Sequence, residues 1–414
     1  MDMHSRNQYL KTLQQRYFQA RSKKEKSSIL DEYCRNTHQN RKYAISKINS
    51  SFSSTPRRRK KRKQIYDGHV KVALAKLWEI FDYPCGQRLA PLLKTEVARL
   101  RQLEEIFIPN EVAEKLKAIS PATIDRKLKH QREVLHLKRS RAKPKPSSLL
   151  YRKIPIKLTE WDTSKVGFLE IDLVTHCGSS TSGLYICSLN TVEISSGWWE
   201  AEAVMGKGQD PTFEALKRIR ERAPFQWLGI DSDNDSAFIN DHLVRYCERE
   251  NLEFTRSRPN KKNDNAYIEQ KNWTHVRKTV GYLRYDADKE LTIMNSLYEN
   301  ELRLYKNFFQ PVMKLIKKER VGAKVKRKYD IPKTPHQRLI QSGQISEEAK
   351  RKLQILYQSL NPAELKRRID KKTHKLYHAY EEKRKGQEAI PFKRQTPRTV
   401  RKYMIQQPQF RSGG

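Results

Sequence analysis

The chain has 414 residues, enough for two to four domains. It carries 85 Lys and Arg against 47 Asp and Glu, and a net charge of +38 attracts polyanions. The hydrophobic content of 36% excludes disorder throughout the chain. We therefore expect nucleic acid as the partner, with ribosomal or membrane-surface binding as the alternative.

The sequence offers no signal for a membrane or an oxidising compartment. No stretch of about 18 residues is continuously apolar, and the first residues lack the apolar region of a secretory signal. The five cysteines are scattered and never spaced as CxxC, which predicts reduced thiols and no structural zinc. The pair His176-Cys177 lacks a second ligand pair, so a strand position without a ligand role is favoured. We expect a cytoplasmic, nucleoid-associated protein.

Residues 1–50 are expected to be helical, with helices at 23–33 and 40–48 separated by a polar turn. A short helix, a turn and a basic second helix predict a helix-turn-helix module, and any small helical bundle is the alternative. A basic linker at 51–67 contains seven consecutive cations, Arg57 to Lys63, which beside DNA-binding modules would follow phosphates.

Residues 68–137 are expected to form a second helical DNA-binding module. Asn110 is predicted to cap one helix. Ser120-Pro121 predicts the start of the next, because serine accepts from free N–H groups and proline fits the first helical position. This second helix-turn-helix candidate presents three groove contacts: Thr123, Arg126 and Lys127.

After a stiff basic linker at 138–159, the pattern changes to alternating strands and helices over 160–285. The expected strands lie near 166–174, 183–190, 191–205, 226–231 and 252–257. The expected helices lie near 211–222, 236–250 and 263–283. This order predicts a mixed α/β sheet with helices on its faces. A basic β and helical region follows at 286–382, with a small β module at 317–328 and helices at 346–381. Residues 383–414 are expected to be a basic tail.

Three carboxylates are the main candidates for chemistry. Asp172 lies in an apolar run that predicts a strand, Asp233 follows a second such run, and Glu269 lies in the first turns of a predicted helix. Exactly 35 residues separate Asp233 from Glu269. Converging acids bind cations or repel each other, and Mg²⁺ prefers such hard oxygen ligands. Two Mg²⁺ ions can serve phosphodiester chemistry, so the cluster predicts a metal site acting on phosphates.

The middle position of this triad has competitors. Asp231 and Asp235 share the strand parity of Asp233. Asp233 is favoured because it falls where the strand is expected to end, at the sheet edge where ligands bind. Glu170 and Asp264 are also possible ligands or salt-bridge partners.

The sequence around the three acids resembles the retroviral-type integrase core of bacterial insertion-sequence DDE transposases. The similar segments are 167–172, 231–234, 257–269, 119–126 and 269–273, and the similarity extends over roughly residues 10–340. It implies an RNase H-like fold with Asp172, Asp233 and Glu269 as catalytic residues and metal ligands. Two Mg²⁺ ions are implied as cofactors, with Mn²⁺ as a substitute.

The resemblance also implies a reaction. Such an enzyme binds the terminal repeats of its element, nicks the 3′ ends by hydrolysis, and joins them to target DNA by transesterification. A homo-oligomer assembled on double-stranded DNA is implied, with an accessory ATPase as a further possible partner. The expected class is a multidomain α and α/β protein: N-terminal helix-turn-helix modules, an RNase H-like mixed-sheet catalytic core and a small basic C-terminal region.

Two features differ from relatives of this kind. Asp235 stands where many have glycine, and the zinc-binding HHCC module of retroviral integrases is missing. An inactive or domesticated relative that acts as a sequence-specific DNA-binding regulator is therefore the alternative function. A plain RNase H-like nuclease is less favoured, because it would not need two upstream DNA-binding modules.

Several polar and aromatic residues surround the triad. Four cations before the Glu269 helix are candidate phosphate contacts: Arg256, Arg258, Lys261 and Lys262. Asn265 and Asn272 lie one turn either side of Glu269 and are expected to orient its carboxylate or contact DNA, although Asn265 can instead cap the helix. Three tryptophans are interpreted as packing residues rather than base-stacking ones: Trp198, Trp199 and Trp273.

Overall fold

A computed structural model of the chain forms two compact units, residues 1–64 and 65–414. The structure describes residues 1–50, 65–135, 164–232, 238, 241–256, 266–321 and 324–388. Within these ranges, no helix is both long enough and apolar enough to cross a membrane.

The described part of the first unit, residues 1–50, contains three helices around a small core. They are α1 (Met3–Gln19), α2 (Lys23–Thr37) and α3 (Arg41–Ile48). Each helix is capped by the residue before it: Asp2, Ser22 and Asn40. Each of these side chains accepts a backbone N–H from the first turn of its helix. The helices expected at 23–33 and 40–48 correspond to α2 and α3. The DNA-binding role of this bundle stays a prediction.

The second unit begins with five helices: α4 (Gly68–Ile80), α5 (Gly86–Gln102), α6 (Asn110–Ala118), α7 (Pro121–Lys127) and α8 (Lys129–Val134). The Ser120 cap is confirmed, because its hydroxyl accepts the N–H of Thr123 at 3.3 Å and Pro121 is the first helical residue. The Asn110 cap is wrong: Asn110 is already the first residue of α6, and the preceding Pro109 offers no side-chain acceptor.

A close approach of α5 and α7 depends on a glycine. A Cβ atom at Gly86 would lie 2.1 Å from the carbonyl oxygen of Pro121, so any other residue would force these helix ends apart. The Gly86 N–H also donates to Asp125 Oδ1 on α7 at 2.9 Å. The two helices are therefore fixed together at their starts.

A five-stranded mixed sheet follows, as predicted. Its strands are β1 (Phe168–Thr175), β2 (Ile186–Glu193), β3 (Trp199–Met205), β4 (Gly229–Ser232) and β5 (Glu253–Arg256), in the order β3-β2-β1-β4-β5. Neighbours are antiparallel from β3 to β1 and parallel from β1 to β5. This mixed sheet is consistent with the RNase H-like core that the family resemblance implies.

The boundary expected between the second and third strands, at residues 190 and 191, is wrong. The strand β2 continues to Glu193, and a turn then separates it from β3. The buried Glu193 carboxylate stabilises this turn by accepting the N–H groups of Ser195 at 2.8 Å and Ser196 at 2.6 Å. Gly197 completes it with a φ of 77°. Ser195-Ser196-Gly197 was the turn signal that the sequence offered.

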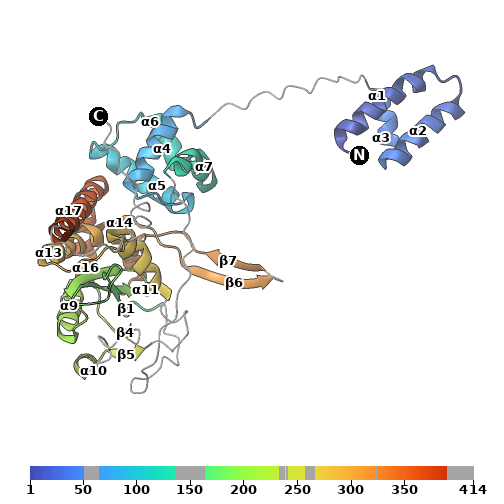
Figure 1. Cartoon of the computed structure of the whole chain (residues 1–414). Helices are drawn as coiled ribbons and strands as arrows, with labels where there is room; N and C mark the ends of the chain where they lie inside the picture. The colour runs from blue at the N-terminus through green and yellow to red at the C-terminus, as the bar shows by residue number, and fades with distance from the viewer. Residues whose placement is uncertain are drawn as a thin grey trace. The chain divides into compact units, whose positions relative to one another are not determined.

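Helices cover both faces of the sheet (Figure 1). On one face, Leu169, Ile171 and Leu189 pack with buried residues of α9 (Gln209–Arg222) and α10 (Asp241–Arg249). On the other, Val174 and Trp199 pack with buried residues of the π-helix η1 (Asn272–Arg277), α12 (Lys278–Val280), α13 (Asp288–Ser296), the π-helix η2 (Leu297–Leu302) and α14 (Arg303–Phe309). The helix α11 (Ala266–Lys271) directly precedes η1 and contacts β1 and β2.

A hairpin and three helices make up the rest of the described residues. Strands β6 (Leu315–Val321) and β7 (Lys324–Tyr329) form an antiparallel hairpin, as predicted for the basic region. The helices α15 (Pro335–Ser342), α16 (Glu347–Ser359) and α17 (Pro362–Glu388) follow. The helices predicted at 346–381 correspond to α16 and α17, but α17 extends into the range expected for the tail.

The helices α4 and α5 pack against the C-terminal helices. The Tyr305 hydroxyl donates to the carbonyl of Ile80, and Gln310 donates to the carbonyl of Phe81 at 2.9 Å. Arg367 makes two bonds of 2.7 Å to the Glu105 carboxylate. Residues 65–135 therefore belong to the same compact unit as the sheet.

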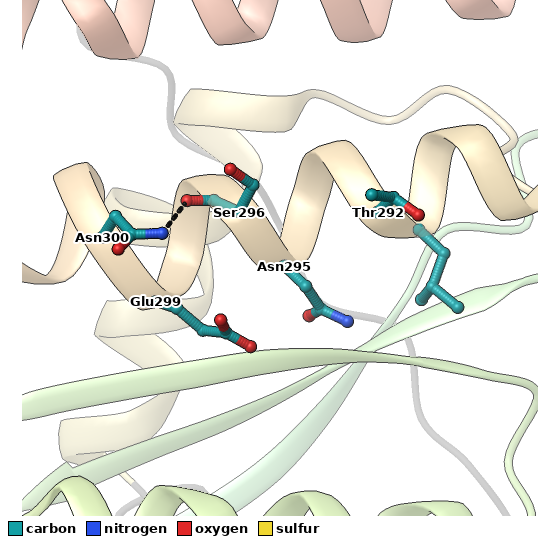
Figure 2. A pocket seen from close by; sticks show the side chains of 6 residues that line it. Thr292, Asn295, Ser296, Glu299 and Asn300 are labelled. Carbon is teal, nitrogen blue, oxygen red and sulfur yellow. Dashed lines mark hydrogen bonds between the residues drawn. The ribbon is translucent and has the colours of Figure 1, made fainter.

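The edge strand β3 is covered by two asparagines that imitate a further strand. Asn307 accepts the Trp199 N–H and donates to the Trp199 carbonyl, both at 2.8 Å. Asn295 makes the same pair of bonds to Ala203, at 2.6 and 3.0 Å. Figure 2 shows Asn295 directed from its helix toward the sheet. The exposed edge that would otherwise pair with another chain is thereby satisfied.

Replacing Asn307 by Ala is expected to lower the free energy of unfolding by about 2–4 kcal/mol, because both backbone groups of the buried Trp199 lose their partners. Chemical denaturation measures the change. The matched control is Asn300→Ala, since Asn300 is bonded to the Ser296 carbonyl of its own helical segment and should cost under about 1 kcal/mol. Equal losses for the two variants would contradict the edge-capping role.

Candidate functional site

Asp172 lies on β1 between the two strands that flank it. It is opposite Asn190 of β2 in the antiparallel register. Its side chain is half-buried, and Oδ1 accepts the N–H of Leu173 at 2.7 Å. Oδ2 accepts a hydrogen bond from Nδ2 of Asn272, the first residue of η1. Both oxygens are thus held by this chain.

A line of side-chain hydrogen bonds ends at this carboxylate. The indole N–H of the buried Trp199 donates to Asn190, and Asn190 in turn donates to Asn272. Asn272 then donates to Asp172. We call these three residues (Trp199, Asn190 and Asn272) the amide relay. Since each amide uses its oxygen to accept and its nitrogen to donate, the relay fixes the orientation of the Asp172 carboxylate.

Glu269 lies on α11, which is attached to β1 on both sides of it. Immediately before it, the buried Ile268 donates its N–H to Glu170 Oε2 at 2.8 Å. Three residues after it, Asn272 bonds Asp172. Because the first attachment precedes Glu269 and the second follows it within one turn, α11 cannot shift along β1 without breaking one of them. The Glu269 side chain itself is exposed.

The competing acids occupy different environments. Glu170 is 1% exposed and anchors α11 by accepting the Ile268 N–H. Asp231 is fully buried within β4 and accepts the hydroxyl of Thr255 at 2.7 Å. The strand β4 ends at Ser232, and Asp233 is the next residue in the chain. The remaining candidates lie outside the described residues: Asp233, Asp235, Arg258, Lys261, Lys262, Asp264 and Asn265.

Buried basic side chains lie close to Glu269 in the sequence and in the fold, and they were not identified from the sequence. Lys271 Nζ is 3.3 Å from His275 Nε2, and both residues are buried. Burial lowers the pKa of Lys271 to about 7, helped by Arg88 and Lys306. Burial also lowers the pKa of Lys306 to about 8 and that of His275 well below its usual value. The i, i+4 spacing of Lys271 and His275 was the available signal.

The residues predicted to contact DNA differ in their exposure and in their hydrogen-bond partners. On α7, Arg126 is exposed and donates to Thr123 Oγ1 at 3.3 Å, whereas Lys127 donates to the backbone of Tyr66. Arg256 is only 4% exposed, so burial leaves it little surface for a phosphate, a correction to the sequence-based assignment. The Asn272 amide is bonded to Asp172 and Asn190, so the carboxylate that it orients is that of Asp172 and not, as expected, that of Glu269.

The tryptophans also divide into two groups. Trp198 and Trp199 are 2% and 0% exposed, which confirms them as packing residues. Trp273 is 41% exposed, so unlike the other two it is not a core residue, although its ring contacts that of Tyr282. Helical spacing from Glu269 was the only sequence signal that distinguished this residue.

No cluster of three or more His, Cys, Asp or Glu side chains with metal-binding geometry occurs within the described ranges, which omit Asp233. A shallow pocket lies elsewhere, along α13 and η2 (Figure 2). None of the predicted site residues lines it. Its lining residues are Leu291, Thr292, Asn295, Ser296, Glu299 and Asn300.

Comparison with known proteins gives one long sequence match. No family model matches the chain. The uncharacterized protein y4rM of Sinorhizobium fredii is 35% identical over 336 residues, covering 81% of this chain and 95% of that protein. Among solved structures, the HTLV-2 integrase catalytic core with magnesium is 14% identical and the BIV integrase catalytic core 13% identical. They cover 35% and 42% of this chain and 89% and 95% of theirs, each with a TM-score of 0.27.

Proposed function

We propose that this chain, which belongs to the same family as the y4rM protein of Sinorhizobium fredii, is a DNA transposase of the DDE type. It binds the terminal repeats of its element and nicks their 3′ ends by hydrolysis. It then joins the freed 3′-hydroxyls to target DNA by transesterification. The catalytic residues are Asp172, Asp233 and Glu269.

The observation that carries this proposal is the double attachment of α11 to β1. Glu170 holds the N–H of Ile268, and Asn272 holds the carboxylate of Asp172. A helix and a strand far apart in sequence are thus joined at the residues next to two acids of the D,D(35)E pattern. Rigid positioning of this kind is what phosphoryl transfer requires from a protein, since the covalent chemistry is slight.

The donor chemistry fits divalent cations. Asp172 offers a half-buried carboxylate and Glu269 an exposed one, and both are hard oxygen ligands of the type that Mg²⁺ prefers. With Asp233 as third ligand, these residues would hold two Mg²⁺ ions, or Mn²⁺ in their place. When bound, the ions supply activation of the attacking oxygen and charge stabilisation of the leaving oxygen. The amide relay would hold the Asp172 carboxylate in one orientation for such a ligand role.

Charge supports DNA as the substrate. In the β6–β7 hairpin, Lys317 lies opposite Lys328 and Lys318 opposite Arg327, and these side chains are exposed. Lys317 also forms a salt bridge of 2.5 Å with Glu319. Like charges directly across a two-stranded hairpin repel, and a phosphate backbone relieves that repulsion. We assign phosphate contacts to this hairpin and to Arg258, Lys261 and Lys262, with end recognition by α7 through Thr123, Arg126 and Lys127. The active form is a homo-oligomer on paired ends in the nucleoid, with a partner ATPase as an optional component.

The test is strand joining by the full chain, with a labelled duplex that carries the ends of the encoding element. Joining should require Mg²⁺ or Mn²⁺ and stop with EDTA. Asn272→Ala, which interrupts the amide relay at Asp172, should slow joining roughly 10- to 100-fold while end binding is unchanged. The exposed Asn300→Ala is the matched control and should join at the normal rate.

Two outcomes would count against these assignments. Specific end binding with no joining in either metal would favour the alternative, a DNA-binding regulator whose Asp235 impairs the site. An Asn272→Ala protein that joins at the rate of Asn300→Ala would remove the orienting role of the relay.

A further inference from the structure

Two exposed aromatic side chains lie together beside the candidate site. Trp273 on η1 and Tyr282, two residues after α12, are each 41% exposed. Their ring centroids are 6.2 Å apart and their planes are tilted by 40°. Four other tryptophans in the described ranges are at most 2% exposed: Trp78, Trp198, Trp199 and Trp227. Among the tryptophans that the structure describes, Trp273 is therefore the exposed one.

A cation braces the pair against the sheet. The guanidinium carbon of Arg277 lies 4.7 Å from the centroid of the Tyr282 ring. Arg277 also donates to the backbone carbonyl of Thr175, the last residue of β1, at 2.7 Å. We call Trp273, Arg277 and Tyr282 the aromatic platform. The Arg277 guanidinium lies over the Tyr282 ring, and its bond to Thr175 attaches the platform to the end of β1.

The platform is connected to both acids by short lengths of rigid structure. Trp273 follows Asn272, which bonds Asp172, and comes four residues after Glu269, about one helical turn. Thr175, which receives the Arg277 bond, is three residues after Asp172 on the same strand. A DNA strand held at the acids would thus pass close to the exposed rings.

We propose that the aromatic platform stacks an unpaired base of the DNA that the acids process. An exposed ring offers a face that any base can stack on, and an adjacent arginine adds cation–π attraction and a contact for the phosphate. A base within a duplex has no free face, so the platform takes a nucleotide that has left its pair. The inference rests on the proposed function and assigns the platform to holding the opened strand end.

The test uses tryptophan fluorescence of the full chain with Trp161→Phe, because Trp161 lies outside the described residues. Two probes of equal length are titrated in EDTA: oligothymidylate and an abasic deoxyribose-phosphate oligomer. Oligothymidylate should quench the fluorescence and bind about tenfold more tightly than the abasic probe. Trp273→Ala should abolish the quenching and bind both probes equally, while Trp273→Phe keeps part of the preference.

The matched control is Phe107→Ala, which removes an aromatic ring that is 84% exposed on another surface and should keep the full preference. A thermal melt of Trp273→Phe equal to the parent, together with a retained preference, supports the platform even where Trp273→Ala unfolds. An undiminished base preference in folded Trp273→Ala, or none in the parent protein, overturns it.

Failure of the proposed function gives a different result. A chain that keeps the Trp273-dependent base preference but joins no DNA supports the platform and contradicts the transposase assignment. If the parent protein joins DNA but Trp273→Ala shows the same base preference as the parent, the platform alone is contradicted.

Discussion

Asp172→Asn and Glu269→Gln are each expected to reduce strand joining by about 1000-fold or more, while binding to the element's ends stays nearly unchanged. Each substitution removes one negative charge from a proposed metal ligand, and the charge stabilisation that a metal ion supplies is worth several kcal/mol. Each 1.36 kcal/mol corresponds to a tenfold change in rate. A strand-joining assay and a binding assay on the same preparations measure the two quantities.

The middle acid has a matched control two residues away. Asp233→Asn should abolish joining like the other two substitutions. Asp231→Asn should leave joining largely intact, because Asp231 is fully buried and an amide oxygen at that position can still accept the Thr255 hydroxyl. If Asp231→Asn abolished joining and Asp233→Asn did not, the ligand assignment would be wrong.

Two truncations are expected to differ sharply. Removing residues 1–64 should leave a folded protein that binds DNA but has lost part of its end specificity, because these residues form a separate compact unit. Removing residues 1–130 should abolish cooperative folding, because it strips α4 and α5 from Tyr305 and Phe309, which are 1% and 0% exposed. Each such aromatic stabilises the fold by about 1.5–3 kcal/mol, against a total of about 5–15 kcal/mol.

Circular dichroism during thermal denaturation distinguishes the two truncations, and competition between element ends and random duplex measures specificity. A shorter chain that melted cooperatively would show that α4 and α5 are dispensable to the fold. Unchanged end specificity after removal of residues 1–64 would contradict a recognition role for α1 to α3.

Local chemistry made several features predictable from the sequence alone. Ser120 and Pro121 start α7 because a hydroxyl acceptor and a missing N–H both suit a helix N-terminus. Apolar runs marked β1 and β4, and the basic run after residue 315 marked the hairpin. The spacing of the acids and the segments around them also singled out Asp172 and Glu269, whose catalytic role is the proposal made above. These signals act over a few residues, so the sequence displays them directly.

Tertiary structure decided how the acids are held and which neighbours serve them. Asn190 and Asn272 are 82 residues apart, and Asn272 and Asp172 are 100 residues apart. No local sequence pattern could therefore predict the amide relay. Glu170 was a possible ligand in sequence, but it proved to anchor α11 because its side chain shares the face on which that helix packs. Exposure likewise separated Trp273 from Trp199, since burial depends on what the rest of the chain places over each ring.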